Sequence, residues 1–295
     1  MSEFLVHALT IVAIQGLVAL ALNFQAGSAG LMNFGHVAFV GVGAYAVGIA
    51  HQMQWHPALG WALGIAMAGG LGLGMALLGR NLSADYWGIA TLAVAEIVRT
   101  VALNEDWLTG GAQGISGIAP LWGALDPGTR RWAFLLTAAI ALAVVAGLCA
   151  RAAAGRFGRA LRLMREEPAL ATSLGYSLLS LKCRATAASA MVAGLAGCFL
   201  GHYVSFVGPD FMQASETFMA WTMVMLGGVG NVAGVVLGVV LVQAVHMGVP
   251  FVKDIAGVGS DAAGALRLGL VGCLLLACLL WRREGLLPEK PRRLP

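Results

Sequence analysis

Long apolar segments dominate the pattern of this chain. No Asp, Glu, Lys or Arg occurs between Phe4 and Gly79. That stretch is long enough for three membrane crossings, because one transmembrane helix takes about 20 apolar residues to cross a hydrocarbon core of about 30 Å. The whole pattern predicts apolar helices over Phe4–Leu22, Gly30–Ala50, Pro57–Leu78, Ala84–Leu103, Trp132–Ala150, Arg184–Val207, Thr217–Val229, Val232–Val249 and Gly264–Trp281. We therefore expect an all-α integral membrane protein with one transmembrane domain, 1–295, a polytopic bundle of about 8–10 transmembrane helices, some short or broken.

A charged segment from Arg151 to Lys182 interrupts the apolar pattern. At 100° per residue its first part divides into two faces. Phe157, Ala160, Leu161 and Met164 form the apolar face, and Arg156, Arg159, Arg162 and Arg165 fan across the other. This predicts a helix at the membrane surface, with its arginines toward lipid phosphates or a soluble partner. Pro168 suits a first helical position and Gly175 a left-handed stop, so a very short second helix is expected over Pro168–Leu174.

Basic residues indicate which loops face the cytoplasm. Most of them lie in the segment 151–184 and in the tail 282–295, so both are expected to be cytoplasmic, and the loop Asn104–Arg131 to be outside. The chain after Arg184 must then cross an even number of times. Thr217–Val249 must therefore be two passes that turn at the glycines around Asn231. The side of the N-terminus stays open.

Two glycine-rich segments resemble each other, Asn23–Tyr45 and Met225–Gln243. They suggest a pseudo-repeat of two halves. Broken apolar segments in corresponding halves point to a pathway near the midplane, because unwound backbone is tolerated there only beside a cavity or inside protein. On this interpretation the path is lined by Asn33, His36, Gly227, Gly228, Gly230 and Asn231. The alternative is close helix packing through Gly230, Gly234 and Gly238, and the two are compatible.

Few ionisable groups lie inside the predicted spans. Glu96 is a candidate for the path because intramembrane charges are usually functional, but a structural pair with Arg99, three residues on, is favoured. His36 could donate a hydrogen bond in the path or bind a neighbouring helix carbonyl. No histidine spacing suggests a metal site, and the five cysteines form neither a zinc pattern nor a disulfide framework.

Composition excludes whole classes of protein. With 59% hydrophobic and 11% charged residues and a mean hydropathy of +0.82, no soluble domain of this length could bury its apolar surface. The net charge of +4 does not imply nucleic acid, because the arginines cluster at membrane edges rather than among stacking aromatics. We expect lipid and protein partners and no nucleic acid.

Six blocks of sequence follow one another in a specific order. They are GSAGLMNFGHVAFVGVGAYA (27–46), SADYWGIATLAVAEIVRTVALN (83–104), LTGGAQGISGI (108–118), FGRALRLMREEPALATSLG (157–175), SFVGPDF (205–211) and MVMLGGVGNVAGVVLG (223–238). Together they resemble one known family, the M-type permease subunits of ABC importers for branched-chain amino acids. The resemblance implies a multi-pass protein of the bacterial inner membrane that forms a pore with an H-type paralogous permease. It also implies two cytoplasmic ATP-binding subunits below and a periplasmic substrate-binding protein above. The family's coupling loop maps onto Arg165–Gly175, which makes the coupling residues Arg165, Glu166, Glu167, Pro168, Ala171 and Gly175.

The chain has no nucleotide-binding loop of its own. None of its lysines, Lys182, Lys253 and Lys290, follows a GxxxxGK[ST] pattern, so we expect no cofactor here and ATP on the partner subunits. An intramembrane enzyme is disfavoured, because the serine of GISG (114–117) lies in an external loop without a base. The alternatives left open are a permease for urea, amides or aromatic acids, and a stand-alone facilitator. The substrate is not readable from the sequence.

Overall fold

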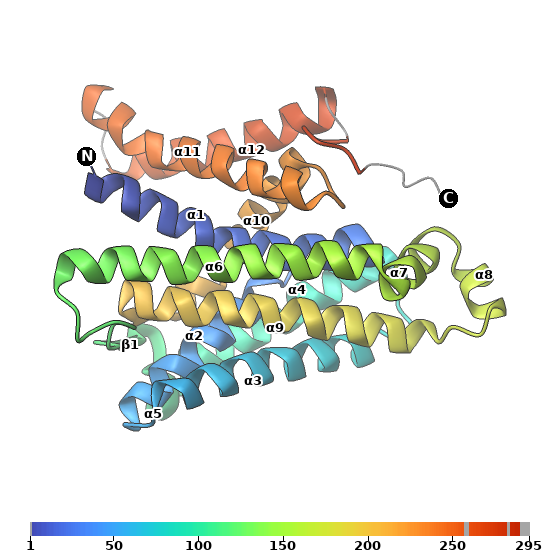
Figure 1. Ribbon diagram of the computed structural model, residues 1–295, viewed down its shortest axis with the longest axis horizontal. Helices are drawn as coiled ribbons and strands as arrows, with labels where there is room; N and C mark the ends of the chain where they lie inside the picture. The colour runs from blue at the N-terminus through green and yellow to red at the C-terminus, as the bar shows by residue number, and fades with distance from the viewer. Residues whose placement is uncertain (1, 257–259, 282–283, 290–295) are drawn as a thin grey trace.

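The computed structural model describes residues 2–256, 260–281 and 284–289, and almost all of them are helical (Figure 1). The helices are α1 Ser2–Asn23, α2 Val37–Gln52, α3 Pro57–Leu78, α4 Ala84–Asn104, α5 Asp106–Thr109, α6 Pro127–Ala154, α7 Arg156–Glu166, α8 Pro168–Ser173, α9 Leu178–Val204, α10 Ala214–Gly227, α11 Val232–Ala256 and α12 Ser260–Trp281. A π-helical turn, η1 Phe24–Ser28, follows α1, and short 3₁₀ turns occupy η2 Gly111–Gln113 and η3 Pro209–Met212. The strands β1 Ile115–Ser116 and β2 Phe206–Val207 form one antiparallel pair.

The long helices run lengthwise beside one another, so the bundle has two distinct ends (Figure 1). We call them the α8 end, which carries α7 and α8, and the β1 end, which carries β1 and α5. Helix α1 begins at the β1 end, where Glu3 forms an ion pair with Arg131. His7 Nδ1 lies 2.6 Å from the Tyr203 hydroxyl at the same end. The N-terminus, which the sequence left unassigned, therefore lies on the same side as the 104–131 loop.

All nine predicted apolar helices are present, and the turn between α10 and α11 lies at residues 228–231 as expected. Within the described residues, six helical segments are long and apolar enough to cross a membrane, and Val37–Gln52 is a shorter apolar helix. The chain is thus an all-α polytopic membrane protein.

Several boundaries differ from the prediction. The helix expected from Gly30 begins only at Val37, because Gly30 adopts φ +68° and the chain unwinds after η1. The helix expected over Arg184–Val207 runs from Leu178 to Val204, and residues 206–207 form β2 instead. The charged insert is correspondingly shorter than predicted, since 151–154 extend α6 and 178–184 belong to α9.

Small residues hold the centre of the bundle together, where α2, α3 and α9 cross. A Cβ atom on Gly197 of α9 would lie 1.9 Å from the Val40 carbonyl oxygen, and one on Gly43 of α2 would lie 2.0 Å from the Gly194 carbonyl oxygen. In lipid, where apolar side chains gain nothing by leaving hydrocarbon for one another, such close backbone contact supplies the packing energy between helices.

We expect Gly197→Val to destabilise the protein by roughly 1–3 kcal/mol, because the new side chain must push the α2 backbone away. Thermal unfolding in detergent, followed by fluorescence or by loss of the monodisperse peak, measures the effect. Gly70→Val in α3 is the matched control, since nothing lies within 4 Å of a Cβ there. Equal unfolding temperatures for the two variants would contradict this account of the core.

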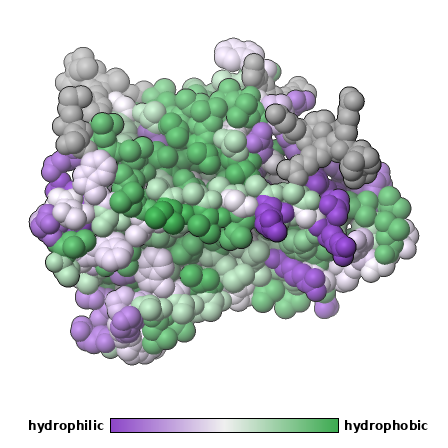
Figure 2. All heavy atoms as spheres, in the orientation of Figure 1, coloured by the Kyte–Doolittle hydropathy of each residue, from purple (hydrophilic) through white to green (hydrophobic). Residues whose placement is uncertain are grey.

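The outer face of α6 is apolar along its length. Leu136, Ile140, Val144 and Leu148 are each more than half exposed. Figure 2 shows apolar residues over the middle of one face of the molecule, with polar groups toward both ends. This is the distribution that a surrounding bilayer requires.

Candidate functional site

The short helix α8 projects from the α8 end of the bundle (Figure 1). Pro168 occupies its first position, as predicted, and Gly175 adopts φ +84° just after its end. Only Ala171 of α8 is buried, whereas Leu170 is 48% exposed and Leu174, directly after the helix, is 62% exposed. A protruding helix with apolar residues on its free face has the form of a protein contact.

Helix α7 anchors α8 to the bundle. Its buried residues are Gly158, Ala160, Leu161 and Met164, so the predicted apolar face is confirmed. The sequence predicted that the arginines of α7 all point away from the protein, but two of them do not. Arg165 and Arg162 approach Glu289, with N–O distances of 3.2 and 3.5 Å, and Arg165 also donates to the carbonyl of Gly27.

Residues 284–289 fold back onto the turn between α10 and α11. The N–H groups of Leu286 and Leu287 donate to the carbonyls of Leu226 and Gly227 at 2.9 and 3.0 Å. Asn231 Nδ2 donates to the Pro288 carbonyl at 3.2 Å. Together with Glu289, this segment links the turn to α7, and we call it the tail clasp (284–289). The sequence predicts only that the tail is basic. The acidic residues within it, Glu284 and Glu289, are the signal that could have indicated this contact.

The two glycine-rich segments meet at the α8 end. The Gly230 N–H donates to Asn23 Oδ1 at 2.8 Å, and a Cβ on Gly27 would lie 2.6 Å from the Gly230 nitrogen. Gly228 and Gly230 take φ values of +115° and +86°, which only glycine adopts without strain. Gly234 and Gly238 pack on α10, so the close-packing interpretation holds for these two.

A polar network supports the unwound segment between α1 and α2. Asn33 Nδ2 donates to Gln25 Oε1 at 3.3 Å, and Trp221 Nε1 of α10 donates to the Asn33 carbonyl at 2.9 Å. Thr91 Oγ1 and Thr217 Oγ1 accept the N–H groups of Phe34 and Val37. Backbone groups freed from helical bonding are thus satisfied by side chains of two other helices, α4 and α10, as a low-dielectric interior requires.

His36 is fully buried beside this network. Its ring packs edge-on against Phe39, with centroids 5.6 Å apart. Neither ring nitrogen makes a hydrogen bond of ordinary geometry, although the Val18 carbonyl is beside the ring. Buried polar atoms without a good partner are uncommon. His36 differs in this respect from Asn33, whose side chain is hydrogen-bonded to Gln25.

Glu96 lies apart from this group. Its side chain is 52% exposed on α4 and forms the expected pair with Arg99, with Arg99 Nη2 2.6 Å from Glu96 Oε1. The structure therefore places Asn33 and His36 in the interior of the bundle and buries Gly227 and Gly228 at the turn of the α8 end, whereas Gly230 is partly exposed there and Glu96 lies on the surface.

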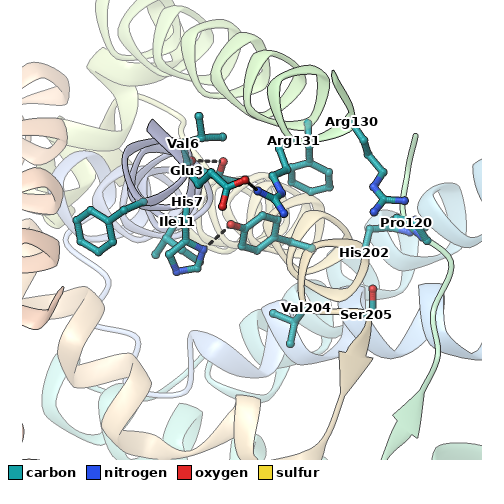
Figure 3. Close-up of a pocket in the computed structure, with 14 residues that line it drawn as sticks. Glu3, Val6, His7, Ile11, Pro120, Arg130, Arg131, His202, Val204 and Ser205 are labelled. Carbon is teal, nitrogen blue, oxygen red and sulfur yellow. Dashed lines mark hydrogen bonds and ion pairs between the residues drawn. The ribbon is translucent and has the colours of Figure 1, made fainter. Parts of the chain in front are cut away.

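A cavity of about 730 Å³ opens at the β1 end between α1, α6 and α9 (Figure 3). Glu3 and Arg131, which line it, form an ion pair, and His202 donates from Nδ1 to the Ala119 carbonyl at 2.7 Å. Near it, the Thr129 N–H donates to the Asp126 carboxylate at the start of α6 and lowers the pKa of Asp126. Because that pKa is depressed, this cap contributes stability at neutral pH and is lost as pH falls through the lowered value.

Among the described residues, no group of three or more His, Cys, Asp or Glu is placed to hold a metal ion.

Comparison with known proteins gives one consistent result. The profile of the family described as "Branched-chain amino acid transport system / permease component" matches residues 4–279. The high-affinity branched-chain amino acid transport system permease proteins LivM of Salmonella typhimurium and Escherichia coli are each 28% identical over 305 residues, covering 95% of this chain and 69% of theirs. A probable branched-chain amino acid transport permease protein LivM from Methanocaldococcus jannaschii is 28% identical over 314 residues, covering 93% of this chain and 90% of the relative. No solved structure matches significantly.

Proposed function

Because this chain belongs to the family of permease components of branched-chain amino acid transport systems, we propose that it forms half of the membrane path of an ATP-driven importer of branched-chain amino acids. It is a permease and not an enzyme, and it is a multi-pass protein of the bacterial inner membrane. The other half of the path is an H-type paralogous permease. Two cytoplasmic ATP-binding subunits supply the energy, and a periplasmic binding protein delivers the substrate.

The observation that carries this proposal is the protruding helix α8. Uphill transport needs nucleotide hydrolysis, and the chain has no loop for a nucleotide. A motor on a separate polypeptide must hold the permease at a rigid projection. Arg165, Glu166, Glu167, Pro168, Ala171 and Gly175 build that projection, which makes the α8 end cytoplasmic and the β1 end periplasmic.

The residues of the unwound segment before α2 and of the turn between α10 and α11 are our candidates for the path. They are Asn33, His36, Gly227, Gly228, Gly230 and Asn231, and they surround the broken segments of the two halves. Glu96 lies elsewhere, on the exposed face of α4. A charge pair exposed on a spanning helix is unfavourable against hydrocarbon, which supports placing this face of α4 against the second permease or the path between the two.

Reconstitution tests the function directly. We expect the chain to co-purify with the two ATP-binding subunits and the second permease. In proteoliposomes supplied with the binding protein, L-leucine uptake should require ATP on the α8 side. Uptake without ATP would support a stand-alone facilitator, and ATP-driven uptake of urea or an aromatic acid but not of leucine, isoleucine or valine would overturn the substrate class.

A further inference from the structure

The cavity at the β1 end lies where three long helices reach the same surface. Glu3 is in the first turn of α1, Arg130 is in the first turn of α6, and Val204 is the last residue of α9. Ile11 also lines the cavity, and it lies about 12 Å further along α1 than Glu3, at the 1.5 Å rise per residue of an α-helix. The lining is thus charged at the helix ends and apolar further in, beside Ile11 and Phe134. A bilayer has the same change of polarity from its headgroups to its hydrocarbon.

The two helices that flank the cavity expose apolar side chains at this level. Leu5 and Leu9 of α1, and Trp132 and Leu136 of α6, are each more than half exposed. In a multi-pass membrane protein such residues meet lipid, and tryptophan is typical of the headgroup level. A lipid beside α1 and α6 therefore has its headgroup at the height of the cavity.

Arg130 gives the cavity an uncompensated positive charge. The charged side chains among the described lining residues are Glu3, Arg130 and Arg131, and Glu3 is neutralised by its ion pair with Arg131. The Arg130 guanidinium is half-buried, and in the described part of the chain no carboxylate lies within 4 Å of it. Phosphate is an anion that a guanidinium binds with two parallel hydrogen bonds, and basic pockets between transmembrane helices bind anionic headgroups.

His202 is an independent sign of a ligand. Its side chain lines the cavity and is only 5% exposed. Because the Ala119 carbonyl can only accept, Nδ1 carries the ring proton, and Nε2 of the neutral ring presents a lone pair. Nε2 has no hydrogen-bond partner among the described residues. A buried acceptor of this kind is uncommon, and it is matched by a ligand that brings an O–H or N–H group.

We propose that this cavity binds an anionic phospholipid whose headgroup carries a hydroxyl, as in phosphatidylglycerol. Arg130 holds the phosphate, the hydroxyl donates to His202 Nε2, and the first part of the acyl chains lies against Ile11 and Phe134. An ammonium headgroup fits less well, because Arg130 and Arg131 repel it. The site lies at the β1 end, apart from the candidate path residues, so it does not depend on which solute the protein carries.

Two lipids that differ only in the headgroup hydroxyl test the assignment of His202. Phosphatidylethanol has the same phosphodiester and the same net charge as phosphatidylglycerol, but it has an ethyl group where phosphatidylglycerol has glycerol. Native mass spectrometry of the delipidated full chain in detergent gives the dissociation constant of the first bound lipid. We expect phosphatidylglycerol to bind about fivefold more tightly than phosphatidylethanol, the effect of one neutral hydrogen bond. Phosphatidylcholine, which has neither net charge nor hydroxyl, should bind more weakly than both.

Substitutions separate the two parts of the site. Arg130→Gln should weaken both anionic lipids about tenfold, the effect of losing one charge-assisted hydrogen bond, and keep the preference for phosphatidylglycerol. His202→Phe should leave phosphatidylethanol binding unchanged and abolish that preference. Arg80→Gln is the control, because Arg80 is an exposed arginine just after α3 and outside the cavity. It should bind all three lipids as the parent does.

The soluble headgroup identifies the source of the ligand. Glycerophosphoglycerol is phosphatidylglycerol without its acyl chains, and we expect it not to displace the lipid at equal concentration. Displacement would overturn the lipid and assign the cavity to a soluble phosphate ester. Equal affinity of the parent for phosphatidylglycerol and phosphatidylethanol, or parent-like affinity of Arg130→Gln, would overturn the site itself.

Discussion

Gly175→Val is expected to abolish ATP-driven leucine uptake, at least a tenfold loss, while the protein still inserts. Gly175 adopts φ +84° between α8 and α9, and a left-handed conformation costs roughly 1–2 kcal/mol for a residue with a Cβ. Nothing lies within 4 Å of a Cβ at this position, so the substitution acts on the turn and not on packing. The turn must change its path, and α8 then leaves its position.

Leucine uptake and ATP hydrolysis by the reconstituted transporter measure this effect separately. We expect hydrolysis to persist without transport, because the motor loses its hold on the permease and not its own catalytic site. Replacing Glu167, which precedes α8, by Trp should act in the same direction. Gly147→Val in α6 is the matched control, since it also has no atom within 4 Å of its Cβ but lies within a regular helix. Normal uptake by inserted Gly175→Val would count heavily against coupling through α8.

The second large effect is expected at the tail clasp. Glu289→Arg places a third positive charge beside Arg162 and Arg165, whose side chains are each 27% exposed. Repulsion should release the clasp from α7 and separate α8 from the turn at residues 228–231. We expect at least a fivefold loss of coupled uptake, because breaking one side of a partly buried charge cluster costs about 2 kcal/mol or more.

A double-mutant cycle separates this mechanism from general damage. Arg165→Glu should also reduce uptake, and Arg165→Glu with Glu289→Arg should recover a substantial part of it, since the two charges are exchanged. Glu284→Arg is the control within the clasp, because Glu284 forms no ion pair with α7. Losses that simply add in the double variant would show that the pair does not act as a unit.

Local signals explain what the sequence predicted correctly. Apolar length identified the spans, and Pro168 and Gly175 located α8 because each restricts its own backbone. The three-residue spacing of Glu96 and Arg99 predicted their pair for the same local reason. The sequence could not show that Gly27 meets Gly230 or that Glu289 meets Arg165, since these contacts join residues more than a hundred positions apart.

The direction of the α7 arginines was misjudged for a related reason. A helical wheel assigns a residue to a face, but it does not reveal which other segment covers that face. Arg162 and Arg165 are on the predicted side and find Glu289 there instead of lipid. The late start of α2 has a similar cause, because side chains of α4 and α10 form hydrogen bonds with the unwound backbone in this interior.

In the proposed importer, the contact between Gly27 and Gly230 bears on how fast the path can open. Bulky side chains that interlock must change rotamers before two elements separate, whereas these two backbones touch directly. They are joined by the hydrogen bond from Gly230 to Asn23 and bridged by Arg165, which contacts both the Gly27 carbonyl and Glu289. Separating them breaks the Gly230–Asn23 hydrogen bond, worth about 1 kcal/mol, and releases the Arg165 contacts with the Gly27 carbonyl and Glu289. Two backbone surfaces in direct contact can thus separate and rejoin in every transport cycle, because the contact between them re-forms without a change of side-chain rotamers.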